Sequence, residues 1–128
     1  MPQRSQECVF CSIAAGDAAA HIVFQTDKYC CIRDRYPVND GHTLLFPTQH
    51  VRHLEAADWG SLTATLDRAI EYVRSETDPD GLNVGINDGP AAGQTIPHLH
   101  WHIIPRYEGD MENPAGGVRG VIPEKQKY

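Results

Sequence analysis

A single long amphipathic segment, with short strand-like runs on both sides, most constrains the fold of this chain. Between residues 58 and 77, apolar side chains recur at three- and four-residue steps, so one stripe can pack on a sheet while charged side chains face water. These apolar residues are Leu62, Leu66, Ala69, Ile70 and Val73. The following residues, Asp78-Pro79-Asp80-Gly81, are typical of a turn. We therefore predict one long helix that covers a sheet.

The strand-like runs indicate an antiparallel sheet. They span residues 22–25, 29–33, 43–46, 82–87 and about 97–105. Because these runs do not alternate regularly with helices, an α+β domain is favoured over a parallel α/β fold. A short N-terminal helix is also expected over residues 9–15, with Gly16 at its end. The expected fold class is thus α+β, with about five antiparallel strands, one long helix and one short helix.

Length and charge limit the domain organisation and the partners. The 128 residues, 41% of them hydrophobic, fit a single domain over residues 1–128, and the Gly- and Pro-containing segment from about 109 to 128 is expected to be an irregular tail. The net charge of −6 disfavours a nucleic-acid partner. No run approaches the roughly 18 apolar residues of a membrane span, and residues 1–7 are polar, so we expect a cytoplasmic protein with no membrane partner.

The most informative motif is the run of residues 98–104, HLHWHII, in which three histidines alternate with apolar residues. In a strand, His98, His100 and His102 would share one face while the apolar residues between them enter the core. Such a face can be merely polar, can bind a catalytic metal, or can supply a nucleophile with neighbours that position a phosphate. The adjacent loop at 87–95, NDGPAAGQT, offers exposed backbone N–H groups to an anion. This adjacency favours phosphate chemistry.

The histidine run fits the histidine-triad pattern His-φ-His-φ-His-φ-φ, where φ is an apolar residue, and further segments fit that family in the same order. These segments are CVFCSI at 8–13, Asp34 with Pro37, GHTLLFP at 41–47, His50, Asn87 and GQT at 93–95. Over most of its length the chain resembles the histidine-triad nucleotide-binding proteins, and in particular their zinc-containing bacterial branch. The resemblance implies a histidine-triad fold that dimerises edge to edge into one continuous sheet.

The resemblance also implies a hydrolase or transferase acting at the α-phosphate of a purine nucleotide. His100 would attack the α-phosphorus and form a nucleotidyl-histidine intermediate, and His102 would bond the bridging or departing oxygen. Around the phosphate the resemblance places the catalytic residue His42 and the binding residues Asn87, Gly93, Gln94 and Thr95. It places Asp34 at the ribose hydroxyls and the base in an apolar slot formed by Val9, Phe10, Ile13 and Ile32. Taken alone, Asp34 could equally cap a local turn, and the slot residues could be ordinary core.

Two substrate classes and two other functions remain open. The substrates are dinucleoside polyphosphates and nucleoside 5′-phosphoramidates, and both require the same nucleophile. The C-terminal tail is similar to that of members described as dinucleoside polyphosphate hydrolases, where Arg119 could contact a distal phosphate or simply be solvated. A nucleotide-binding scaffold with little turnover is one alternative function, and a small metalloprotein with no nucleotide role is another.

The cysteines suggest a metal site at the N-terminus. Cys8 and Cys11 are spaced so that both can reach one metal from a single helical turn. The resemblance implies that His50 and His98 complete a structural zinc site. The same spacing also fits a redox pair or buried thiols. The vicinal pair at 30–31 lies in an expected strand and is expected to contribute buried apolar volume.

Overall fold

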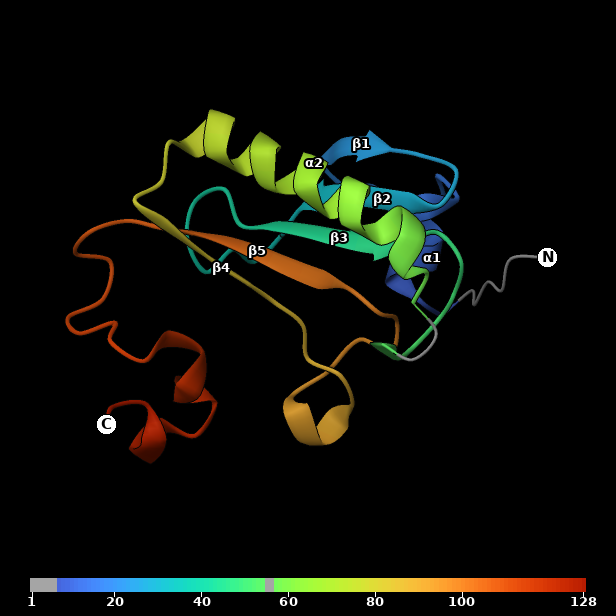
Figure 1. Ribbon diagram of the computed structural model, residues 1–128. Helices are drawn as coiled ribbons and strands as arrows, with labels where there is room; N and C mark the ends of the chain where they lie inside the picture. The colour runs from blue at the N-terminus through green and yellow to red at the C-terminus, as the bar shows by residue number, and fades with distance from the viewer. Residues whose placement is uncertain (1–6, 55–56) are drawn as a thin grey trace.

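The computed structural model describes residues 7–54 and 57–128 and confirms the α+β class, with a five-stranded antiparallel sheet, one long helix and one short N-terminal helix (Figure 1). In chain order, the elements are α1 (Val9–Ala14), β1 (Ile22–Gln25), β2 (Tyr29–Arg33), β3 (Thr43–Pro47), α2 (Trp59–Thr77), β4 (Gly81–Gly85), the 3₁₀ turn η2 (Pro90–Ala92), β5 (Trp101–Arg106) and the 3₁₀ turns η3 (Gly117–Val121) and η4 (Pro123–Lys125).

The strand order in the sheet, β1-β2-β3-β5-β4, places the last strand of the chain inside the sheet. Every neighbouring pair is antiparallel, and β5 pairs with β3 on one side and β4 on the other. Burial alternates along β5, so that its odd-numbered residues are buried and its even-numbered residues are half-buried. A strand paired on both sides is a rigid support for the side chains that it carries.

The two faces of the sheet are covered by different helices. The long helix α2 lies across one face, where Leu62, Ala69 and Val73 pack with Leu45 and Trp101 (Figure 1). The opposite face packs against α1 through a smaller core that consists of Cys8, Phe10, Cys11, Ile13, Cys30, Ile32, Leu44 and Phe46. We call these the α2 face and the α1 face.

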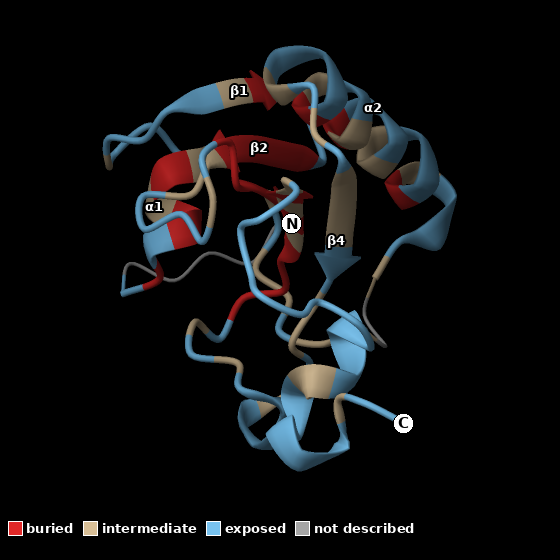
Figure 2. Cartoon of the chain, turned by 90° about the vertical axis from the view of Figure 1, so that its left-hand side faces the viewer, coloured by how far each residue is buried: buried red, intermediate tan, exposed pale blue. Residues whose placement is uncertain are grey.

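Strand β2 contributes to both faces and is buried along almost its whole length (red in Figure 2). Cys30 packs on the α1 face and Cys31 on the α2 face, since successive residues of a strand point in opposite directions. Burial raises the pKa of Cys30 to about 11 and that of Cys31 to about 12. These thiols therefore stay protonated and act as apolar volume, as the sequence predicted.

Strand β5 is shorter than the sequence predicted, because it begins at Trp101 rather than before His98. The register pairs Leu45 with Trp101, and its continuation would place Pro47 opposite Leu99. Proline has no N–H to donate to a ladder, and the N–H of Leu99 donates instead to the carbonyl of Val51, at 2.7 Å. His98 and His100 consequently precede the strand. Strand β4 also differs from the prediction at one end, because it ends at Gly85 rather than at residue 87.

The alternation of faces nevertheless extends back beyond the start of β5. Leu99 belongs to the core of the α2 face, whereas the rings of His98 and His100 lie edge-on to Phe10 on the α1 face. His102, within the strand, follows the same pattern. The three histidines thus share one side of the sheet although only one of them lies in a strand.

The C-terminal tail was expected to be irregular, but it contains the two short 3₁₀ turns η3 and η4. Most of its residues are exposed, including Val118 and Val121 (pale blue in Figure 2). Within the described part of the chain, no helix combines the length and the apolar character needed to cross a membrane.

Candidate functional site

Two clusters of titratable side chains lie on the α1 face. The first, which we call the Cys–His cluster, consists of Cys8, Cys11, His50 and His98. The second, which we call the histidine relay, consists of Asp34, His42, His100 and His102. The backbone between His98 and His100 joins them, so one short stretch of chain serves both clusters.

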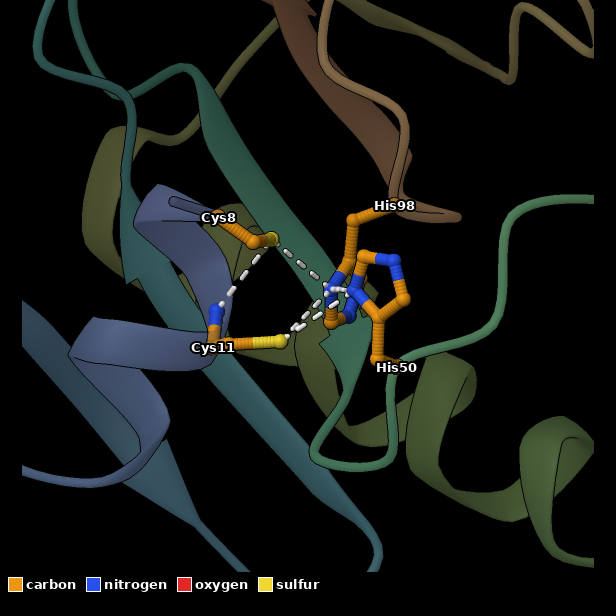
Figure 3. Close-up of side chains that lie close together, drawn as sticks. All are labelled: Cys8, Cys11, His50 and His98. Carbon is orange, nitrogen blue, oxygen red and sulfur yellow. Dashed lines mark hydrogen bonds between the residues drawn. The ribbon is translucent and has the colours of Figure 1, made fainter. Parts of the chain in front are cut away.

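The Cys–His cluster gathers four potential metal ligands from three segments (Figure 3). Helix α1 supplies both sulfurs, from its N-cap residue Cys8 and from Cys11 one turn later, while His50 follows β3 and His98 precedes β5. All four ligand atoms lie within 4.8 Å of one another. The sequence placed these residues together through a resemblance, and the structure does bring them together.

The distances in the Cys–His cluster fit a tetrahedral ion. The Sγ atom of Cys8 is 3.3 Å from Nδ1 of His98, the Sγ atom of Cys11 is 3.2 Å from Nδ1 of His50, and the two Nδ1 atoms are 3.2 Å apart. Ligands at about 2.0–2.3 Å from a tetrahedral zinc ion would lie roughly 3.3–3.8 Å from one another. The cluster can therefore hold a divalent metal, and four protein ligands would leave no open position.

The orientation of His98 supports a ligand role. Its Nε2 lies 2.7 Å from the carbonyl oxygen of Pro47, and a carbonyl only accepts hydrogen bonds, so Nε2 carries the ring hydrogen. The lone pair of Nδ1 then points at the sulfurs. Burial lowers the pKa of His98 to about 4, so the ring is neutral at neutral pH, which is the form that binds a metal.

The histidine relay is ordered by a backbone donor. The N–H of Val38 donates to Nδ1 of His42 at 3.0 Å, so the neutral ring of His42 must carry its hydrogen on Nε2. That Nε2–H faces Nδ1 of His102 at 2.9 Å. His102 therefore accepts through Nδ1 and carries its own hydrogen on Nε2. Burial lowers the pKa of both rings, that of His102 to about 4, and keeps both neutral.

His100 is oriented in the opposite sense. Its Nδ1 donates to the carbonyl oxygen of His98 at 2.8 Å, which leaves the lone pair of Nε2 free to react. The side chain is buried, with ring centroids 5.0 Å from both Phe10 and His102, and burial lowers its pKa. A neutral imidazole with a free nitrogen next to a ring N–H donor has the makings of a nucleophile with a neighbouring hydrogen-bond donor.

Asp34 lies at the start of the relay. Its Oδ1 accepts the N–H of Tyr36 at 2.9 Å, which is the turn-capping role that the residue type alone suggested. Its Oδ2 is 3.4 Å from Nε2 of His42. Asp34 is thus in contact with the relay as well as with its own turn, and its implied contact with a ribose remains a prediction.

The Gly-rich loop at 87–95 lies between the end of β4 and the histidines, with Gly89 and Gly93 both at positive φ. The amide of Gln94, expected to contact phosphate, is engaged by the backbone: it accepts the N–H of Gly89 and donates to the carbonyls of Arg52 and Ile96, at 2.8–3.1 Å. In this structure Gln94 therefore fixes the shape of the loop. Its predicted neighbours in the loop are the half-buried Asn87, which lies beside Gly93, and the exposed Thr95.

The apolar slot residues differ in exposure. Phe10, Ile13 and Ile32 are buried in the core of the α1 face, whereas Val9 is 46% exposed. Phe10 stacks on Phe46 with ring centroids 4.4 Å apart and packs in edge-on geometry against the rings of His98 and His100. Phe10 therefore contributes to the burial that keeps these histidines neutral, and a contact with a base remains a prediction for all four residues.

Three contributors to the site were missed from the sequence. The backbone N–H of Val38 and the carbonyl of Pro47 set the ring hydrogens, and a backbone group leaves no signal in a residue pattern. The third is Asp88, whose Oδ1 lies 3.1 Å from Nδ1 of His53 and accepts the N–H of Leu54 at 3.3 Å. It ties the Gly-rich loop to the segment that follows His50, and an aspartate in an Asn-Asp-Gly sequence is usually just a turn residue.

Comparisons with known proteins agree with this geometry. Residues 15–109 match the HIT domain. A zinc-bound histidine triad family protein from Mycobacterium smegmatis is 36% identical, with a TM-score of 0.74 over 84% of this chain and 80% of that one. A HIT family member from Bacillus subtilis is 32% identical, with a TM-score of 0.76 over 82% and 77%. The adenylylsulfatase HINT3 of Arabidopsis thaliana is 36% identical over 108 residues, which are 81% of this chain and 54% of that protein.

Proposed function

The chain belongs to the HIT family, the histidine triad family that its motifs resemble, and from this premise we propose that it is a nucleotide hydrolase or nucleotidyl transferase acting at the α-phosphate of a purine nucleotide. One observation carries the proposal: the free Nε2 of His100 lies next to His102, whose Nε2 carries a hydrogen. A lone pair and a donor hydrogen on neighbouring rings, whose centroids are 5.0 Å apart, are what a phosphorus centre and its departing group require.

In the first step, Nε2 of His100 attacks the α-phosphorus. The bond from phosphorus to nitrogen forms as the bond from phosphorus to the leaving group breaks, and Nε2–H of His102 donates a hydrogen bond to the departing atom. The ring of His100 gains positive charge in this step, and the carbonyl of His98 stabilises it by accepting Nδ1–H. Water then displaces His100 from phosphorus and releases the nucleoside monophosphate.

The Gly-rich loop supplies the remaining contacts in this proposal. Donors fixed around the equatorial oxygens stabilise the charge of the transition state, and one well-aimed donor is worth about 3 kcal/mol. We assign this role to Asn87, Gly93 and Thr95. Gln94 acts by holding the loop, as its backbone contacts indicate. Asp34 at the ribose, and the base beside Val9, complete the nucleotide site.

We assign zinc to the Cys–His cluster as a structural ion. The tetrahedral spacing, the two sulfurs and the zinc-bound mycobacterial neighbour support this assignment. A bound ion would tie α1 to the chain just before β5, and so fix the backbone that carries His98 and His100. The chemistry at phosphorus uses the histidine relay and does not pass through the metal.

Two substrate classes fit the mechanism, dinucleoside polyphosphates and nucleoside 5′-phosphoramidates, and the name of the plant relative adds adenylyl sulfate as a third compound to test. Incubation with each compound, followed by mass spectrometry, should detect a nucleotidyl adduct on His100, and His102→Ala should alter its rates of formation and decay. Binding of AMP without an adduct or product from any compound would instead favour the nucleotide-binding scaffold.

We also propose that the protein is a cytoplasmic homodimer that binds no nucleic acid. The net charge of −6 supports the last point. For the dimer, β4 is an edge strand with Val84 37% exposed, and unpaired edges favour pairing with a second copy. Sedimentation of the purified protein tests the dimer directly, and a monomer at micromolar concentration would contradict it.

A further inference from the structure

A cavity of about 600 Å³ lies between the C-terminal tail and the sheet, and none of the roles assigned above uses it. We call it the tail cavity. The sheet contributes Asn83, Ile104 and Arg106, and the tail contributes Met111, Val118 and Val121. The volume is within the range of about 300–1,000 Å³ that is usual for ligand pockets.

The tail cavity lies beside the histidine relay. Val38 lines the cavity, and its backbone N–H is the donor that orients His42. Ile104 lies two residues after His102 in β5, and residues two apart on a strand share a face and lie about 7 Å apart. In the proposed mechanism, His102 faces the departing group, so the cavity lies within reach of a departing group that is large enough to extend along β5 past His102.

The charged side chains in the cavity compensate each other. Nε and Nη2 of Arg106 donate to the two carboxylate oxygens of Asp110 at 2.8 and 2.9 Å, and its Nη1 donates to Oδ1 of Asn83 at 2.6 Å. Asn39 also donates to Asp110, at 2.7 Å. A guanidinium held this way by a carboxylate has little attraction left for a phosphate or a sulfate. The cavity suits an uncharged group with an apolar face and a polar edge.

We propose that the tail cavity binds the second nucleoside of a dinucleoside polyphosphate, so that the preferred leaving group carries a nucleoside. This inference rests on the proposed function, because it takes the direction of departure from His102. Val118, Val121 and Met111 offer apolar contacts to the base. The amide oxygen of Asn39 and the amide nitrogen of Asn83, which are the ends that Asp110 and Arg106 do not use, are suited to its polar edge. A small amine or a sulfate would leave most of this volume unfilled.

The direct test is a binding comparison that needs no turnover. We expect a non-hydrolysable methylene-bridged analogue of diadenosine tetraphosphate to bind at least 10-fold more tightly than the matching analogue of adenosine 5′-tetraphosphate, which lacks only the second nucleoside. Val121→Trp should fill the cavity and reduce this difference to less than 3-fold. Ile122→Trp is the matched control, because Ile122 is also exposed but does not line the cavity, and it should retain the difference.

Three results would overturn the subsite. The first is equal affinity of the two analogues, and the second is an equal loss of the affinity difference in the two tryptophan variants. The third is a change of association state in Val121→Trp with the affinity difference intact, because the cavity would then be an interface with a second copy. Turnover is a separate readout. If no substrate yields an adduct on His100 while the affinity difference depends on Val121, the hydrolase proposal fails and the subsite stands. If turnover occurs without an affinity difference, only the subsite fails.

Discussion

The Cys–His cluster and the histidine relay are built from similar side chains yet suit opposite tasks. In the first, the nitrogen of His98 that points away from the cluster faces a carbonyl, so the inward nitrogen has a free lone pair. In the second, the outward nitrogen of His42 faces an N–H, so the inward nitrogen carries a hydrogen. The comparison teaches that the backbone group behind an imidazole decides whether it binds a metal or donates a hydrogen bond.

Composition alone would not separate the two clusters. Ligand atoms of Asp34, His42 and His102 also lie within 4.8 Å of one another, and two histidines with a carboxylate form a common metal-binding set. Metal binding through Nε2 of His42 would place its hydrogen on Nδ1, directly opposite the N–H of Val38. Two hydrogen-bond donors would then face each other, so the hydrogen-bonded relay is favoured over a metal site at these three residues.

The largest effect is expected from loss of the nucleophile. His100→Ala should lower turnover by at least about 10³-fold, because no other relay nitrogen has a free lone pair in this arrangement. Zinc content, measured by elemental analysis, should stay at the wild-type level, since His100 is not one of the four ligands. Turnover within about 10-fold of wild type would show that the covalent mechanism is wrong.

The second largest effect should come from loss of the metal ligands. A metal held at about 1,000 times its dissociation constant stabilises the fold by about 4 kcal/mol, so a chelator should lower the Tm of the wild type by roughly 15 °C. Cys11→Ser should show the lower Tm from the outset and no longer respond to the chelator.

The matched control for this variant is Cys31→Ala, which removes a buried sulfur from the α2 face. It should lose some stability through the cavity that it leaves, yet keep both its zinc and its response to the chelator. Thermal melts with and without chelator, together with zinc analysis, check both variants. An undiminished chelator response in Cys11→Ser would exclude the Cys–His cluster as the metal site.

Acid should destabilise the relay. The buried ring of His42 and the half-buried ring of His102 have pKa values below 6.5, that of His102 about 4, whereas in the unfolded chain they bind protons below about 6.5. The contribution of these neutral rings to the free energy of unfolding is therefore fully present above about pH 6.5 and is lost as the pH drops toward about 4. Urea unfolding with a chelator present measures the slope. His42→Gln removes one of these rings and should make the slope shallower, whereas an unchanged slope would contradict the neutral relay.

The smallest effect should come from the tie between the Gly-rich loop and the segment that follows His50. Asp88→Ala breaks the contacts of the Gly-rich loop with His53 and Leu54, at a cost of about 1 kcal/mol. We expect KM to rise by about 5-fold or less, with kcat and zinc content unchanged. Glu71→Ala, on the exposed surface of α2, removes the same charge and should leave KM as it is. Equal kinetics in the two variants would show that the loop needs no such tie.

Patterns of apolar and chemically distinctive residues allowed much of the fold to be predicted. The long helix followed from its apolar stripe, and the strands from short runs between turn residues, with errors only at their ends. The start of β5 was wrong because its pairing depends on Pro47, which is distant in sequence and becomes the neighbour of Leu99 only after folding. A register between strands is a property of the folded chain and is absent from either segment alone.

The residues that meet in the candidate site were predicted, but the orientation of each ring and its backbone partners were not. Histidine spacing and family resemblance indicated which side chains meet, and the Cys–His cluster is the clearest example. The three backbone contacts of Gln94 could not be predicted, because they depend on where the segment after His50 runs, and its expected contact with phosphate stays a prediction. Which nitrogen of each ring carries hydrogen could not be predicted either, since it depends on tertiary contacts.

The main-chain origin of these contacts has a consequence for mutagenesis. An alanine scan would alter side chains at Val38 and Pro47 yet leave in place the amide hydrogen of the first and the carbonyl oxygen of the second. Such a survey would rate both positions as dispensable for proton placement. Replacing an amide by an ester through chemical synthesis would be the direct probe. It would test whether the main chain itself determines which ring nitrogens carry hydrogen.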